Sequence, residues 1–200
     1  MSTSSQALFK KSSLAIAVAL ACTAASTFAQ QDAKTQAKTQ IQTVDAGGVS
    51  FEVPSTWKSS KPASPMRKAQ IKISAAEGDT DPAELIVFAF SGGGGGVDAN
   101  VTRWQKTFKD KDGNPPKPEI KTLRGKNTEV TRVEMAGHYY PTAFPNMPQQ
   151  PDKEGFRLLA AIVITDNNGY FLRLVGPEKT MAGARADFEK VIASLKVDEK

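Results

Sequence analysis

The feature that most constrains the fold is a series of short apolar segments with the two-residue period of β-strands. Residues 48–54 (GVSFEVP) and 67–74 (RKAQIKIS) alternate apolar and polar side chains, as half-buried strands do. Residues 83–90 (AELIVFAF) form a continuous apolar run of the kind expected for a central strand. Residues 120–140 are predicted to form two strands joined by a turn at RGKN. The central part of the chain is therefore predicted to form a β-sheet.

A hairpin and two helices complete the predicted elements. Residues 157–177 predict a β-hairpin, because Asn168-Gly169 is among the strongest tight-turn signals. Residues 97–109 and 178–197 instead have the period of amphipathic helices. Their apolar stripes are Val97, Val101, Trp104 and Phe108 in the first, and Met181, Ala184, Phe188, Val191, Ile192 and Leu195 in the second. Together these elements predict an α+β fold, an antiparallel sheet of about six to seven strands layered with helices.

Residues 1–29 have the pattern of a secretory signal peptide. Two lysines precede a short apolar stretch, and the small residues Thr27 and Ala29 favour cleavage after Ala29. The apolar stretch is too short for a membrane-spanning helix, which needs about 20 residues. An alternative makes Cys22 a lipid-anchored N-terminus, but the residues before it fit that signal poorly, so we favour simple cleavage. The protein is expected to be secreted or periplasmic, with no membrane span.

Residues 30–45 are predicted to be a flexible polar tether. This segment is rich in Gln, Thr, Ala and Lys, contains a near-repeat of AKTQ, and offers almost nothing to bury. The following residues, 46–198, are predicted to form a single domain, since their number lies inside the usual size range of domains.

The composition of the mature chain excludes several chemistries. Cys22 is the only cysteine, so cleavage leaves no disulfide, no thiol nucleophile and no cysteine metal ligand. Cleavage also removes two lysines and lowers the formal net charge from +5 to +3. The remaining positive residues are spread along the chain, whereas nucleic-acid binders concentrate them on one face. No nucleic-acid partner is therefore expected.

Several motifs resemble those of a known family. The strand ending F-x-V-P-x-x-W (residues 51–57) and the closing helix F-x-x-V-I-x-S-L-K (188–196) are similar to the PsbP-like superfamily, which includes the PsbP subunits of photosystem II and a Ran-binding nuclear import factor. Residues 91–104 and 170–180 also resemble uncharacterised exported bacterial proteins, frequent in planctomycetes. The resemblance covers residues 47–197. It implies a PsbP-like α/β/α sandwich and a binding or assembly role, and no functional residue carries over by position.

The run Gly92, Gly93, Gly94, Gly95 and Gly96 raises the question of a phosphate-binding loop. A P-loop requires Lys and then Ser or Thr after its last glycine, and here Val97-Asp98-Ala99 follows. Asp98 is better suited to an N-cap or a first helical turn, where a negative charge is favourable. We therefore favour a structural corner between a strand and a helix. Binding of an anion or a partner backbone by exposed amides is the alternative.

Catalytic and metal sites have no clear candidates in the sequence. His138 is the only histidine and therefore the only candidate base for a Ser-His-Asp triad, and no G-x-S-x-G motif accompanies it. Its nearest carboxylates for a metal, Glu134 and Asp152, match no standard spacing. We expect His138 to be structural, and we expect no catalytic residue, no metal and no cofactor.

The segment from Tyr139 to Glu154 is the better functional candidate. It contains Tyr139, Tyr140, Phe144, Met147 and four prolines. Prolines reduce the entropy lost when a loop is ordered, and aromatic residues with Met are favoured at interfaces. The aromatic side chains could instead fold back over the sheet edge or a core opening.

The sequence therefore favours an exported, non-catalytic binding or assembly module of the periplasm or cell envelope, with an unknown protein partner. Its candidate binding residues are Tyr139, Tyr140, Phe144 and Met147 of the segment 139–154, which we call the aromatic loop, and the five glycines of the glycine run. The alternative is a small-ligand carrier or an unrecognised enzyme with a pocket between sheet and helix. An exposed apolar patch favours the first function class, and a deep pocket ringed by polar side chains favours the second.

Overall fold

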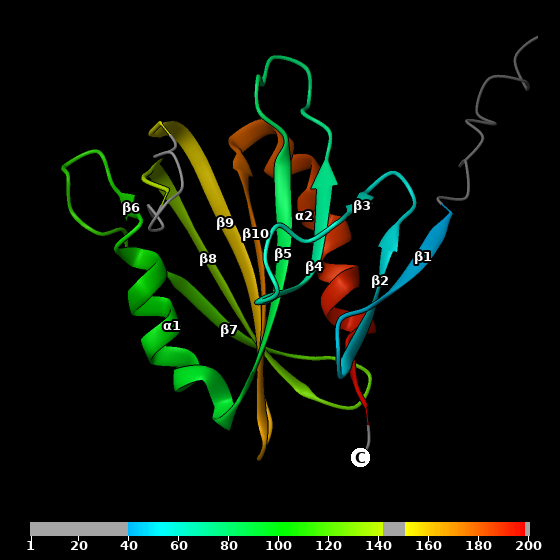
Figure 1. Cartoon of the computed structure of the whole chain (residues 1–200). Helices are drawn as coiled ribbons and strands as arrows, with labels where there is room; N and C mark the ends of the chain where they lie inside the picture. Colours follow the sequence, from blue (N-terminus) through cyan, green and yellow to red (C-terminus); the bar gives the residue numbers. More distant parts are fainter. Residues whose placement is uncertain (1–39, 142–150, 199–200) are drawn as a thin grey trace, which may run out of the picture. The chain divides into compact units, whose positions relative to one another are not determined.

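The computed structural model describes residues 40–141 and 151–198, which fold around a large antiparallel sheet (Figure 1). Within this part, eight strands form the large sheet and three form a smaller one, and every strand pair is antiparallel. The spatial order of the large sheet is β3 (Lys58–Ser60), β4 (Arg67–Ile73), β5 (Ala83–Ser91), β10 (Asn168–Pro177), β9 (Lys153–Ile164), β8 (Glu129–Tyr139) and β6 (Phe108–Lys109), with β7 (Glu119–Arg124) also pairing with β8. The small sheet comprises β1 (Ile41–Asp45), β2 (Val49–Pro54) and β11 (Lys196–Val197).

The helices lie on opposite faces of the large sheet (Figure 1). The helix α2 (Glu178–Ser194) and the small sheet cover one face, and every residue of the predicted stripe of α2 is buried there. The helix α1 (Gly96–Gln105), which follows a short 3₁₀ segment η1 (Gly92–Gly95), packs on the other face through Val101 and Trp104. The predicted α+β sheet layered with helices is therefore confirmed.

A loop residue stabilises the start of α2. The first turn of α2 has no side-chain cap of its own. Asp79, in the loop between β4 and β5, supplies one: its Oδ2 accepts hydrogen bonds from both the backbone N–H and the hydroxyl of Thr180, each at 2.7 Å. Such a bond satisfies one of the N–H groups that a helix start leaves unpaired. Asp79 thereby ties the β4–β5 loop to α2.

Buried charges attach α2 to β8. The side chains of Arg132 and Glu134 are each only 6% exposed. Glu134 accepts a hydrogen bond from Arg157 on β9 at 2.6 Å and another from Arg185 on α2. Arg132 pairs with Glu189 on α2 and, at 2.8 Å, with Glu119 on β7. Because buried charges are tolerated only when they are paired, this network fixes how α2 sits on the sheet.

The ion pairs shift the pKa of two groups. The hydrogen bond from Lys121 and its charge, together with nearby arginines, hold the pKa of Glu119 below its usual value. Burial alone would lower the pKa of Arg157, but its hydrogen bonds to Glu134 and Glu178 outweigh burial and raise it. Arg157 therefore keeps its charge.

Three expected boundaries were wrong. Residues 41–45, expected in the tether, form β1, which pairs with β2 and is fixed by the Gln42 amide donating to the carbonyl of Trp57 at 2.6 Å. The helix predicted over 97–109 ends at Gln105, and Phe108 lies in β6 although it joins the same core cluster. In the hairpin, Asn168-Gly169 already belongs to β10, because the hydroxyl and N–H of Thr165 close the turn at residues 165–167.

The predicted signal peptide, its cleavage point and Cys22 lie outside the described residues. So do residues 30–39 of the predicted tether, and Phe144 and Met147. Neither helix of the described ranges is long and apolar enough to cross a membrane.

Candidate binding face

Tyr139 and Tyr140, the described members of the predicted aromatic site, contact different parts of the protein. Tyr139 is partly buried against the core cluster that contains Val101 and Trp104 of α1, with its ring centroid 4.9 Å from that of Phe108. The ring of Tyr140 stacks on that of His138 at 4.6 Å, and the Nζ of Lys109 lies 5.0 Å from its centre. The two tyrosines therefore do not form one surface, as expected for consecutive residues at the end of a strand.

Tyr139 is linked to an arginine on the same face of the sheet. The Nη2 of Arg173 on β10 donates a hydrogen bond to the Tyr139 hydroxyl at 3.0 Å, and the guanidinium carbon lies 5.6 Å from the ring centre. Arg173 stands directly opposite Ile86 of β5 and Ala160 of β9, which are both buried. A positive charge in the middle of an apolar sheet face is costly unless something compensates it.

Within the described part of the chain, no carboxylate forms an ion pair with Arg173. Its Nε is buried and has no hydrogen-bond partner there. Glu84, two residues before the Ile86 that faces Arg173, is engaged elsewhere. It accepts a hydrogen bond from Gln70 at 2.6 Å and lies 3.8 Å from a nitrogen of Arg67. The guanidinium is therefore held in place by a neutral hydroxyl.

Half-buried aromatic side chains lie on the same face. Phe88 and Phe90 on β5 stack with their centroids 6.2 Å apart, and Phe90 also contacts the buried Phe171 at 6.0 Å. The helix α1 packs on the β6, β8 and β9 side of this face (Figure 1). A set of half-buried residues remains beside it, which we call the open face: Phe88, Phe90, Tyr139, Arg173 and Val175.

The glycine run forms the corner between β5 and α1. All five glycines have positive φ angles, between 58° and 89°, which other residues rarely adopt. The amide of the buried Asn100 donates to the carbonyls of Gly94 and Gly96 at 3.1 and 2.7 Å. A Cβ on Gly94 would lie 2.8 Å from the ring of Phe171, so this glycine allows the corner to pack on the sheet. Asp98 lies in the first turn of α1, which is one of the two positions predicted for it. The N-cap is Gly95.

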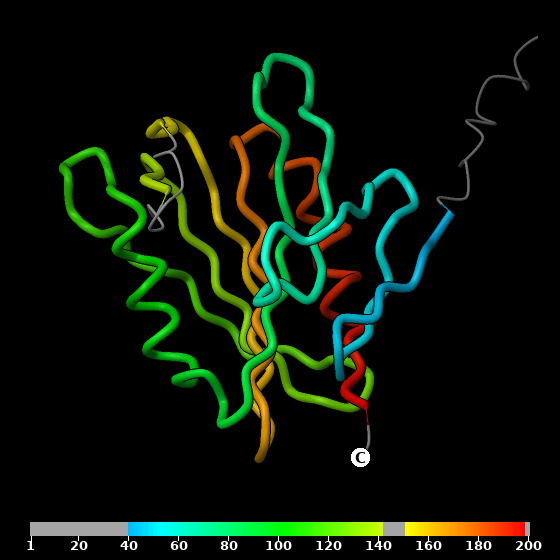
Figure 2. Tube along the Cα trace, in the orientation of Figure 1, coloured from blue at the N-terminus to red at the C-terminus, as the bar shows by residue number. Residues whose placement is uncertain are grey.

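The structure does not bring the two predicted binding segments together. The glycine corner begins α1, whereas Tyr139 pairs with Phe108 beyond the other end of this helix. Figure 2 shows the corner and the end of β8 at opposite ends of α1. A ten-residue helix is about 15 Å long. One small ligand cannot contact both segments.

His138 has carboxylates nearby but no hydrogen bond to them. Its Nε2 lies 3.6 Å from Asp152 and its Nδ1 lies 3.9 Å from Glu154, both beyond hydrogen-bond length. Glu134, the other expected ligand, is bound by arginines. Among the described residues, no three His, Cys, Asp or Glu side chains are placed to hold a metal ion.

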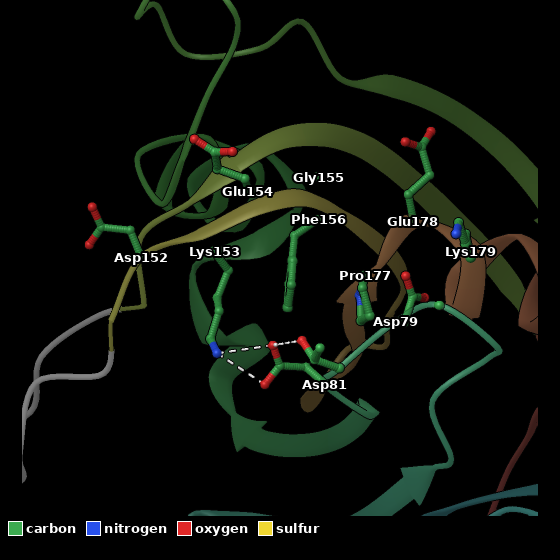
Figure 3. Close-up of a pocket in the computed structure, with 12 residues that line it drawn as sticks. Asp79, Asp81, Asp152, Lys153, Glu154, Gly155, Phe156, Pro177, Glu178 and Lys179 are labelled. Carbon is green, nitrogen blue, oxygen red and sulfur yellow. Dashed lines mark hydrogen bonds and ion pairs between the residues drawn. The ribbon is translucent and has the colours of Figure 1, made fainter.

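A charged pocket of about 420 Å³ lies where the β4–β5 loop, the start of β9 and the start of α2 meet (Figure 3). Several of its charged side chains are engaged in structural contacts. The Nζ of Lys153 donates to both carboxylate oxygens of Asp81 at 3.0 Å, as Figure 3 shows, and Asp79 caps α2. Lys153, Asp81 and Asp79 therefore have structural roles in this pocket.

Sequence reasoning missed Arg173 and the two phenylalanines of the open face. A signal was present, because Phe171, Arg173 and Val175 alternate along one strand and place a charge among apolar residues. Phe88 and Phe90 belong to a continuous apolar run. Because such a run is apolar on both faces of the strand, it does not predict which face is covered.

No protein-family model and no curated protein matches the sequence. Solved structures do match. LpqN of Mycobacterium tuberculosis, a protein involved in cell envelope biogenesis, is 11% identical, with 80% of this chain and 91% of LpqN covered and a TM-score of 0.51. The cyanobacterial PsbP protein CyanoP of Synechocystis is 15% identical, with 80% and 94% covered and a TM-score of 0.48. A Bacteroides thetaiotaomicron protein is 13% identical with a TM-score of 0.46, and the match covers 80% of this chain but only 49% of that one.

Sequence identities this low allow a comparison of the fold but not of the activity. The shared architecture is an antiparallel sheet with helices on both faces, which is what the motifs at residues 51–57 and 188–196 led us to expect. The described part of this chain thus has an α+β fold that it shares with LpqN.

Proposed function

We propose that this chain is an exported, non-catalytic binding or assembly module of the periplasm or cell envelope, and that its open face contacts a protein partner. The main support is the open face, where half-buried aromatic rings surround an arginine without an ion pair among the described residues. Aromatic residues, Met and Arg are enriched at protein interfaces, and Trp, Tyr and Arg dominate their binding energy.

The aromatic rings and the arginine of this face favour a protein partner. A small ligand needs a concave site that buries most of its surface. The pocket of Figure 3 is charged, and in it Lys153 binds Asp81 while Asp79 caps α2. The small-ligand or enzyme alternative therefore has less support than the binding module.

Export is proposed from the pattern of residues 1–29, with cleavage after Ala29. LpqN, which shares the fold, is involved in cell envelope biogenesis, and that location is compatible with the proposal. Mass spectrometry of the protein from its native host tests this part. A mature N-terminus at Gln30 supports simple export, a lipid-modified Cys22 supports anchoring, and a retained Met1 contradicts both.

A crosslinking pull-down from the native cell envelope tests the binding role. The baits are the tagged wild-type protein, the double variant F88S/F90S, and the control I120S. Ile120 is 48% exposed on β7, so its substitution removes apolar surface away from the open face. A further bait with Tyr140, Phe144 and Met147 changed to Ser tests the aromatic loop, which remains a proposed contact.

We expect a partner that is captured by the wild type and by I120S but lost from F88S/F90S. Circular dichroism must first show that each variant is folded. Equal capture by F88S/F90S and the wild type contradicts a role for the open face. Loss from the loop bait alone would instead place the contact at the aromatic loop.

A further inference from the structure

The open face carries a positive charge that the described part of the protein does not neutralise. Arg173 is paired with a hydroxyl, its Nε is buried without a partner, and the nearest carboxylate along β5, Glu84, is bound by Gln70 and Arg67. A guanidinium presents its donors in a planar fork that fits a carboxylate in two parallel hydrogen bonds. The missing partner on this face is therefore an anion.

The surroundings of Arg173 define the rest of the occupant. The flanking rings of Phe88 and Tyr139 and the side chain of Val175 are apolar and half-buried. An occupant whose carboxylate reaches the guanidinium would thus place its neighbouring atoms on apolar surface. Water would be excluded there, which strengthens a charge-assisted hydrogen bond.

We propose that the open face binds a protein segment in which an Asp or Glu side chain engages Arg173 and a neighbouring aliphatic or aromatic side chain packs on Phe88 and Phe90. This inference rests on the proposed function and specifies the chemistry of the partner. A side chain is a better match than a chain terminus, because termini are captured in nests of backbone N–H groups. Here the positive group is a single side chain on a regular strand.

The position of Tyr139 gives it a defined part in this recognition. Its hydroxyl holds Nη2 at 3.0 Å, and its ring lies beside the guanidinium carbon. These contacts orient Arg173 before a partner arrives, which reduces the entropy lost on binding. Tyr139 is therefore a positioning residue, and Arg173 makes the contact.

Binding of short synthetic peptides to the purified full-length protein tests the proposal. One peptide set has a central Asp or Glu flanked by Leu and Phe. The second set replaces the acid by Asn or Gln, and the third replaces it by Lys. We expect the wild type to bind the acidic set about tenfold more tightly than the amide set, because an amide cannot pair with the guanidinium charge. This comparison requires no variant, so it does not depend on any substitution being tolerated.

Variants then locate the contact. Arg173→Gln should remove the preference for the acidic set, and Arg173→Glu should shift the preference to the Lys set. Arg124→Gln is the matched control, since Arg124 is an exposed arginine on β7. Arg173→Lys keeps the charge and should keep a reduced preference. Equal binding of acidic and amide peptides by the wild type, or a preference that survives Arg173→Gln, would overturn the proposal.

The F88S/F90S variant separates this proposal from the proposed function. Capture of a partner that depends on the phenylalanines but is unchanged in Arg173→Gln overturns the carboxylate inference and leaves the binding face in place. If neither change affects capture, both fail.

Discussion

The hydroxyl of Tyr139 and the guanidinium of Arg173 form a hydrogen bond of 3.0 Å across the sheet face beside α1. The two residues come from β8 and β10, which are separated in the sheet by β9. On β9, Arg173 lies opposite Ala160 whereas Tyr139 lies opposite Lys153, so the bond runs diagonally across the intervening strand.

The first prediction concerns the Tyr139 hydroxyl. Tyr139→Phe leaves Nη2 of Arg173 without its acceptor, and we expect the free energy of unfolding to fall by about 1 to 2 kcal/mol. Urea denaturation followed by tryptophan fluorescence measures this change. Tyr140→Phe is the control, because no described residue bonds the Tyr140 hydroxyl, and it should cost less than about 0.5 kcal/mol. Equal effects of the two variants would contradict the role of this bond.

The second prediction concerns the buried charge at Glu134. Its side chain is 6% exposed and accepts hydrogen bonds from Arg157 and Arg185. Glu134→Gln removes the charge that compensates these arginines, so we expect a loss of about 3 kcal/mol in the free energy of unfolding. Asp187→Asn breaks the exposed pair with Lys190 and should cost less than about 0.5 kcal/mol. A small effect of Glu134→Gln would mean that this network does not hold α2.

The sheet was largely predictable because its strands have simple periodicity. The alternating residues of β2 and β4 and the apolar run of β5 predict these strands directly from the sequence. The apolar stripe of α2 likewise predicts its buried face. By contrast, β1 (IQTVD) is exposed on one face and only half-buried on the other, so its apolar pattern is weak, and it is held by its pairing with β2 and by the Gln42 bond to Trp57. Strands of two or three residues, such as β6 and β11, are too short to have a period.

The candidate site was less predictable, because it depends on register and coverage. Tyr139 was identified from its loop, but its partner Arg173 is 34 residues away in sequence. The two meet through the pairing of β8, β9 and β10, which includes a register shift between Gly137 and Tyr139 on β8. The part of the sheet face that α1 covers likewise depends on the glycine corner, where α1 begins. The backbone geometry of that corner cannot be predicted from the pattern of side chains.

The third prediction concerns acid. Because the folded-state pKa of Glu119 lies below its ordinary value of 4.5, its ionised form stabilises the fold above that pH. This contribution is lost as the pH falls from 4.5 through the lower folded-state pKa. We therefore expect Glu119→Gln to lower the melting temperature at pH 7, with the difference from wild type disappearing in strong acid. Glu77→Gln, at an exposed loop position, should show no such dependence. A difference that grows as the pH falls would have the wrong sign.

The last prediction separates packing from backbone strain in the glycine corner. Gly93 and Gly94 are neighbours with positive φ angles of 80° and 58°, so alanine is strained at both positions, by about 1 to 2 kcal/mol. A Cβ on Gly93 meets nothing within 4 Å, whereas a Cβ on Gly94 would lie 2.8 Å from Phe171 and 3.1 Å from Phe90. Gly94→Ala should therefore cost about 1 to 3 kcal/mol more than Gly93→Ala, because it overpacks the contact with the sheet.

Denaturant unfolding of the two variants measures that difference, and peptide binding adds a second readout. Phe90 belongs to the open face and touches Gly94, so a shift of its ring should weaken binding in Gly94→Ala and leave it unchanged in Gly93→Ala. If both alanines cost the same, backbone strain alone accounts for the corner, and the contact between Gly94 and the phenylalanines does not position the open face.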